Sequence, residues 1–158
     1  MSEDIEQLKK AREYAFLLLR HRPRSISEFK EKLERRGFNK DISDVLAADF
    51  KKRGLLDDAR FARMWLEDRM LLKPMGKLRL RQELKNKGIS EFDIEDAISS
   101  AMSGFDEYEA AKTLAQKRLK SITGPDKIAI KRRLFGFLQR RGFSYEVVAK
   151  VVRETVNK

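Results

Sequence analysis

The stretch LQRRGFS, residues 138–144, occurs in three variants along the chain and decides the fold. The earlier copies read LERRGFN at residues 33–39 and LKNKGIS at residues 84–90. Each copy has a leucine four residues before a glycine, an apolar residue directly after the glycine, and then asparagine or serine. The glycines of successive copies are 51 and 54 residues apart. This near-constant period indicates an internal repeat.

Each copy predicts a helix, a tight turn and a second helix. A further apolar residue stands eight positions before the glycine, so apolar side chains line one helical face. Glycine ends such a helix because it adopts the left-handed backbone conformation without steric cost. The asparagine or serine that follows can cap the next helix with its side-chain oxygen. The turn glycines are Gly37, Gly88 and Gly142, and the predicted caps are Asn39, Ser90 and Ser144.

The helical pattern also extends to the residues before each copy, which indicates a third helix in every repeat. No segment shows a sustained alternation of apolar and polar residues, so no sheet is expected. We predict an all-α fold, an elongated array of three tandem three-helix repeats with about nine helices. The predicted boundaries are residues 1–54, 55–104 and 105–158.

Short signals mark the start of individual helices. Ser25 stands three residues before Glu28, the spacing of a capping box. Gly54 is predicted to stop the third helix, and Asp57 or Asp58 to begin the fourth. The apolar face predicted for that fourth helix consists of Phe61, Trp65 and Leu72.

The composition limits the kinds of protein that this chain can be. It has no cysteine, which excludes disulfides and thiol chemistry. No apolar run approaches the roughly 18 residues of a membrane span, and the acidic N-terminus is unlike a signal peptide. A cytoplasmic location without membrane contact is therefore expected. The net charge of +11 favours a polyanionic partner.

The basic charge is concentrated in two of the three middle helices. Residues 73–87 have a net charge of +5 and residues 127–141 a net charge of +6, against +2 for residues 24–36. Residues 90–102, by contrast, hold four acids and no base. Basic residues at the start or middle of a helix are not explained by the helix dipole, although a solvated outer face remains an alternative. The candidate binding residues are Lys77, Arg79, Arg81, Lys85, Lys131, Arg132 and Arg133.

Sequence motifs for catalysis are lacking. The one histidine, His21, lies between two arginines near a predicted helix end. No diagnostic spacing of metal ligands and no glycine-rich phosphate loop occurs. The adjacent carboxylates Asp57 and Asp58 are explained by a helix N-terminus. We expect no catalytic residue, no metal, no cofactor and no enzymatic activity.

Three motifs resemble those of the RecX family of bacterial regulatory proteins. GLLDDARFA at residues 54–62 resembles the family signature, RLRQELKNKGI at 79–89 its second-repeat motif, and FLQRRGFSY at 137–145 its third. The similarity covers roughly residues 10–155, in the same order. The signature residues, to which we assign a structural role, are Gly54, Leu55, Asp57, Asp58, Phe61 and Ala62.

The resemblance implies a non-enzymatic modulator of the RecA recombinase. Such proteins lie in the groove of the RecA–single-stranded DNA filament and mainly inhibit its recombinase, ATPase and co-protease activities, in DNA repair and the SOS response. It implies RecA as partner and, for some members, single- or double-stranded DNA; we expect a monomer. A stand-alone nucleic-acid-binding protein of helix-turn-helix type is the alternative, although the acidic helices after the first two turns argue against it. A scaffold without a polyanionic partner also remains open.

Overall fold

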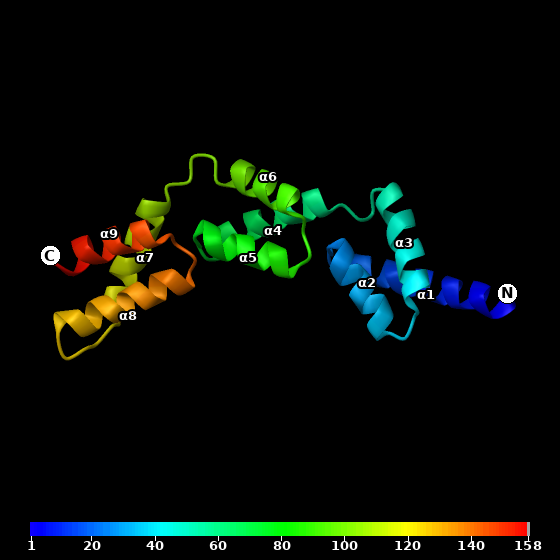
Figure 1. The fold of residues 1–158 in the computed structure, drawn as a ribbon, viewed down its shortest axis with the longest axis horizontal. Helices are drawn as coiled ribbons and strands as arrows, with labels where there is room; N and C mark the ends of the chain where they lie inside the picture. The colour runs from blue at the N-terminus through cyan, green and yellow to red at the C-terminus, as the bar shows by residue number, and fades with distance from the viewer. Residues whose placement is uncertain (158) are drawn as a thin grey trace. The chain divides into compact units, whose positions relative to one another are not determined.

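The computed structural model describes residues 1–157, and within them it contains nine α-helices and no strand (Figure 1). The helices are α1 (Ser2–His21), α2 (Ile26–Arg35), α3 (Lys40–Lys52), α4 (Asp58–Leu72), α5 (Lys77–Asn86), α6 (Glu91–Ala101), α7 (Glu107–Leu119), α8 (Lys127–Arg140) and α9 (Tyr145–Val156). The predicted all-α class and the three successive groups of three helices are confirmed.

The turn after each middle helix is built as the repeated stretch predicts. Gly37, Gly88 and Gly142 have φ angles of +106°, +77° and +85°, which is the left-handed region. In the last of these turns, the N–H of Gly142 donates to Gln139 and that of Phe143 donates to Leu138. This pair of bonds satisfies carbonyls that the helix end would leave unpaired, and it folds the apolar residue back onto the last turn. The bonds recur in the other two copies.

The predicted helix caps are also present. The side chains of Asn39, Ser90 and Ser144 each accept a hydrogen bond from the backbone three residues on, at 2.9, 3.2 and 3.4 Å. At the start of α2, Ser25 and Glu28 form the reciprocal bonds of a capping box. These local bonds fix where the helices begin.

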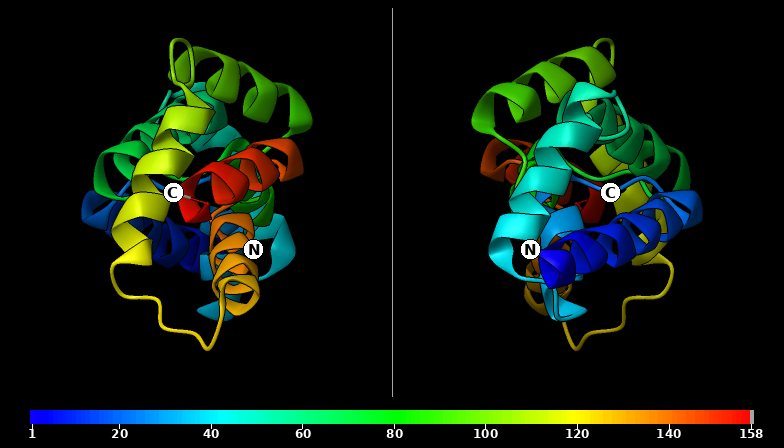
Figure 2. Two further views of the ribbon diagram at one scale, coloured as in Figure 1. Left: turned by 90° about the vertical axis from the view of Figure 1, so that its left-hand side faces the viewer. Right: turned by 90° about the vertical axis from the view of Figure 1, so that its right-hand side faces the viewer.

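The chain forms two compact units. The first, the N-terminal unit, comprises Met1–Met64 and Leu84–Ala97, and the second, the C-terminal unit, comprises Trp65–Glu83 and the described residues from Ile98 on. In the N-terminal unit, α1, α2 and α3 pack on one another (Figure 2, right). Its buried core consists of Ala11, Ala15, Phe29, Leu33, Leu46, Ala47, Phe50 and Leu56.

In the C-terminal unit, α9 packs against both α7 and α8 (Figure 2, left). Its buried core consists of Ala111, Ala115, Leu134, Leu138, Phe143, Val148, Val151, Val152 and Val156. Small alanines on α7 face the valines of α9, so these helices can approach closely. The core therefore positions α8 with one face inward and its basic residues outward.

One detail of the prediction around α4 needs correction. Leu72 is not part of a buried face, since it is 76% exposed. It is in helical phase with the buried Phe61, but it is the last residue of α4. In the signature, the buried leucine is Leu56, at 1% exposure, whereas Leu55 is 40% exposed.

Candidate binding surface

Four of the predicted binding residues lie on α5. Lys77 and Lys85, eight residues apart on the same helical side, are exposed at the start and end of the helix. The half-buried Arg81 stands between them. The inward side carries the fully buried Leu80 and Leu84. The predicted amphipathic division of α5 is therefore present.

Arg79, the fourth of these residues, is tied into an ion-pair network. Its Nε lies 3.4 Å from Oε1 of Glu83, and the other carboxylate oxygen accepts bonds of 3.0 Å from Arg69 and from the indole of Trp65. The Arg69 guanidinium also lies 4.7 Å from the centre of the Trp65 ring. Glu83 thus neutralises part of the positive charge that the sequence places on α5.

The three predicted residues of α8 differ in their exposure. Arg132 and Arg133 are exposed, and Lys131 is half-buried. Arg133 donates a hydrogen bond to the carbonyl of Thr123, in the loop before α8. None of the three forms an ion pair with a carboxylate in the described part of the chain. The positive charge of α8 is therefore less neutralised than that of α5.

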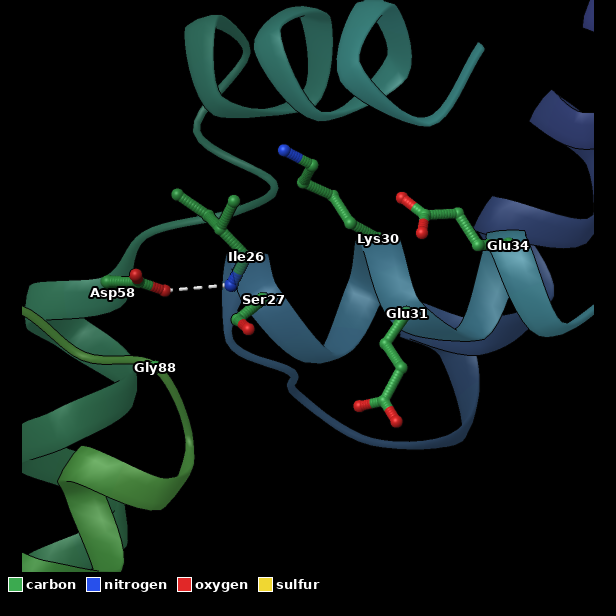
Figure 3. Close-up of a pocket in the computed structure, with 7 residues that line it drawn as sticks. All are labelled: Ile26, Ser27, Lys30, Glu31, Glu34, Asp58 and Gly88. Atoms are coloured by element: carbon green, nitrogen blue, oxygen red, sulfur yellow. Dashed lines mark hydrogen bonds between the residues drawn. The ribbon is translucent and has the colours of Figure 1, made fainter. Parts of the chain in front are cut away.

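The signature carboxylates have structural partners. Asp57 caps its own helix, since its Oδ1 accepts a bond of 3.0 Å from the N–H of Arg60. Asp58 reaches a different helix, where its Oδ1 accepts a bond of 2.8 Å from the N–H of Ile26 at the start of α2 (Figure 3). Burial raises the pKa of Asp58, and the bond from Ile26 partly opposes that rise. Both carboxylates therefore stabilise helix starts, Asp57 that of α4 and Asp58 that of α2.

The turn at Gly88 also packs against the start of α2. We call this contact between a turn and the start of another helix a joint. A Cβ added to Gly88 would lie 2.5 Å from Cβ of Ser27, so only glycine fits against the first turn of α2. The hydroxyl of Ser25, which is fully buried, donates to the carbonyl of Lys87 at 2.7 Å. The Lys87 ammonium in turn pairs with Glu28.

A matching joint occurs in the C-terminal unit. The N–H of Lys77, at the start of α5, donates to Glu107 at 3.0 Å, as Ile26 donates to Asp58. The N–H of Gly76 donates to the carbonyl of Arg141 at 2.8 Å, and a Cβ on Gly142 would lie 2.3 Å from the backbone nitrogen of Arg79. In both joints, the turn of one three-helix group closes onto the first turn of the preceding group's middle helix.

A hollow of about 490 Å³ lies beside the first joint (Figure 3). It is lined by Ile26, Ser27, Lys30, Glu31, Glu34, Asp58 and Gly88. The charged ends of Lys30, Glu31 and Glu34 point in different directions and do not converge on one point (Figure 3). Within residues 1–157, no group of three acidic or histidine side chains is arranged to hold a metal ion. No described helix is long and apolar enough to cross a membrane.

Comparison with known proteins identifies the family. Residues 57–98 match the family model of the second three-helix domain of RecX, and residues 106–152 match that of the third. The chain is 31% identical over 153 residues to the regulatory protein RecX of Amycolatopsis mediterranei, covering 97% of this chain and 87% of the relative. The chain belongs to the RecX family. The RecX protein of Chlorobium phaeobacteroides is 35% identical over 150 residues, covering 95% and 93% of the two chains.

The fold agrees with that of solved RecX structures. The crystal structure of RecX from Lactobacillus salivarius superimposes with a TM-score of 0.78 at 20% identity, covering 98% of this chain and 99% of that one. RecX relatives are described as regulatory proteins. This supports the expectation that the chain has a regulatory rather than a catalytic role.

Some residues of these sites were missed by reasoning from the sequence. Gly76 and Ser27 belong to the joints, but neither lies in a copy of the repeated stretch. Arg140 lies in the last turn of α8, where the helix dipole accounts for a basic residue, and Arg118 lies on α7, outside the two basic middle helices. A glycine within α8, Gly136, is the one signal in that segment that could have drawn attention to the surrounding arginines.

Proposed function

We propose that this RecX protein binds the RecA–single-stranded DNA filament and limits its ATPase, strand-exchange and co-protease activities without catalysing a reaction itself. The observation that carries the proposal is the family membership over nearly the whole chain. The role in DNA repair and the SOS response, and a location in the cytoplasm, belong to the same proposal.

The basic residues of α5 and α8 are the proposed contact surface. The exposed residues are Lys77 and Lys85 on α5 and Arg132 and Arg133 on α8. Their side chains are accessible to acidic protein groups or to DNA phosphates. Attraction between such surfaces acts mainly on the rate of association and on specificity. Arg79 contributes less, because Glu83 already pairs with it.

The test is the RecA ATPase on single-stranded DNA with the protein added. The variant Lys77→Glu/Lys85→Glu reverses two exposed charges without touching the Glu83 network. We expect about tenfold more protein to be needed for half-maximal inhibition, which corresponds to about 1.4 kcal/mol. A matched control, Lys9→Glu/Lys32→Glu, makes the same charge change on exposed lysines of α1 and α2.

Equal inhibition by the α5 variant and by the wild type, with helicity unchanged, would remove α5 from the contact surface. Absence of any effect of the wild-type protein on RecA would overturn the proposed function as a whole. Tight binding to naked DNA together with that absence would favour the stand-alone nucleic-acid-binding alternative.

A further inference from the structure

A hollow in the C-terminal unit is lined by four arginines. It has a volume of about 490 Å³ and lies between the end of α7, the loop that joins α7 to α8, and the exposed side of α8. The arginines come from both helices, and a serine hydroxyl and a threonine from the loop complete the polar lining. The arginines are Arg118, Arg132, Arg133 and Arg140. We propose that this hollow binds phosphate groups.

The charge of the hollow is not balanced from within the protein. No acidic residue lines it, and none of the four arginines forms a salt bridge in the part of the chain that the structure describes. Four guanidinium groups close together repel one another, so an anion that enters gains their combined attraction. Two arginines at other helix ends, Arg35 and Arg53, do pair with carboxylates four residues earlier in the chain.

The arginines are also held in place for binding. The guanidinium of Arg118 lies 5.3 Å from the centre of the Phe137 ring, and its Nη1 lies 3.5 Å from the hydroxyl of Ser121. Arg133 is anchored to the carbonyl of Thr123. Because each guanidinium has five N–H donors, these contacts leave others available. A side chain that is already positioned loses less entropy when a ligand binds.

Gly136 provides the space. It lies inside α8, where glycine destabilises a helix by roughly 1 kcal/mol relative to alanine, and no positive φ angle requires it. A Cβ added there would lie 3.1 Å from Nη1 of Arg140. The missing side chain leaves room for the guanidinium of Arg140, four residues after Gly136, while Arg132 lies four residues before it. Gly136 therefore does not stabilise α8 itself, but it leaves room in the hollow for Arg140.

Phosphate fits this lining better than a carboxylate does. Guanidinium groups bind phosphate oxygens in pairs, and a phosphate offers oxygens to several arginines at once. A single carboxylate has two oxygens and one charge, which is too few for four guanidinium groups. The phosphates can come from the backbone of a nucleic-acid strand or from a free polyphosphate. In the first case, the inference deepens the proposed function by assigning α8 to the DNA of the filament.

The test measures binding without RecA, so that it is independent of the proposed function. The full-length protein is titrated into a fluorescent oligothymidylate, and anisotropy is recorded with inorganic tripolyphosphate or polyglutamate as competitor at constant ionic strength. We expect Arg132→Gln/Arg140→Gln to weaken binding by about tenfold or more, as expected for lost charge-assisted hydrogen bonds. The control Lys9→Gln/Lys32→Gln removes the same charge elsewhere and is expected to leave binding almost unchanged.

A second variant separates binding from folding. Gly136→Ala is expected to raise the thermal unfolding temperature, because alanine favours the helix, and to weaken oligonucleotide binding by about twofold, because Nη1 of Arg140 must shift away from the added methyl. Competition by tripolyphosphate at micromolar concentration identifies a free polyphosphate as a ligand, and binding of the oligonucleotide alone identifies the strand backbone. Equal loss in the lysine control, unchanged binding in both hollow variants, or equally strong competition by polyglutamate would overturn the proposal.

Discussion

Gly142 and Gly37 adopt the same left-handed backbone conformation in different surroundings. Nothing lies within 4 Å of a Cβ placed on Gly37, whereas one placed on Gly142 would lie 2.3 Å from the backbone nitrogen of Arg79. The first glycine is required only by its own turn. The second is required by its turn and by the close approach of α5. The same residue type in the same motif therefore has two different energetic roles.

Substitution by alanine distinguishes these roles. Gly37→Ala is expected to lower the free energy of unfolding by about 1 kcal/mol, the cost of the left-handed conformation alone. Gly142→Ala is expected to lower it by about 3 kcal/mol or more, because steric overlap with backbone adds to that cost. Urea unfolding followed by circular dichroism measures both values. Similar losses in the two variants would contradict the close approach at Gly142.

The N-terminus of α2 shows how an element is stabilised by residues outside it. Its first N–H groups are bound by Ser25, by Glu28 and by the distant Asp58. Glu28 also pairs with Arg22 at 3.2 Å and with Lys87. Burial by itself would raise the pKa of Glu28, but the bonds and charges of Arg22 and Lys87 outweigh burial and lower it. The helix start is thus linked to the turn at Gly88.

This linkage predicts a pH dependence. Because the pKa of Glu28 is lower in the folded than in the unfolded protein, its contribution to stability is present above about pH 4.3 and is lost as pH falls through the folded-state value. Glu28→Gln cannot titrate, so the stability difference between wild type and variant should be largest near neutral pH and should shrink below about pH 4. Urea unfolding at a series of pH values measures the difference. A constant difference at every pH, or the same pattern in the control Glu31→Gln on the exposed side of α2, would contradict this role.

At the scale of the whole molecule, the position of the basic charges matters more for binding than the net charge of +11. Acids neutralise part of the basic charge of α5, whereas the arginines around α8 have no such partners among the described residues. Counterion release depends on the number of phosphates contacted and not on the total charge. Two variants of equal net charge are therefore expected to differ in their salt dependence.

The salt dependence of oligonucleotide binding measures this difference. Arg132→Gln/Arg140→Gln and Lys9→Gln/Lys32→Gln each lower the net charge by two. The first is expected to reduce the slope of log affinity against log salt by about 1.4, since each phosphate contact to a single strand contributes about 0.7. The second is expected to leave the slope unchanged. Equal slopes for both variants would mean that oligonucleotide binding depends only on the net charge and not on where the charges lie.

Much of the fold could be predicted from the sequence, and less of the candidate site. The turn glycines and the caps at Asn39, Ser90 and Ser144 were predicted because each depends on a few neighbouring residues. The sequence places the basic residues on their helices, but it does not show which of them are neutralised by carboxylates. Glu83 pairs with Arg79 four residues away, and also with Arg69, fourteen residues earlier. The second pairing depends on how α4 and α5 pack.

The sequence by itself determined the repeat, the all-α class, the helix ends and the family, because helical periodicity, glycine conformation and side-chain caps act over short stretches of chain. The tertiary structure alone decided which helix Asp58 caps, which glycines meet another backbone, and which arginines gather around Gly136. These features join residues that are distant in sequence, such as Asp58 and Ile26, which are 32 positions apart. Their contact depends on packing between helices, which local patterns do not specify.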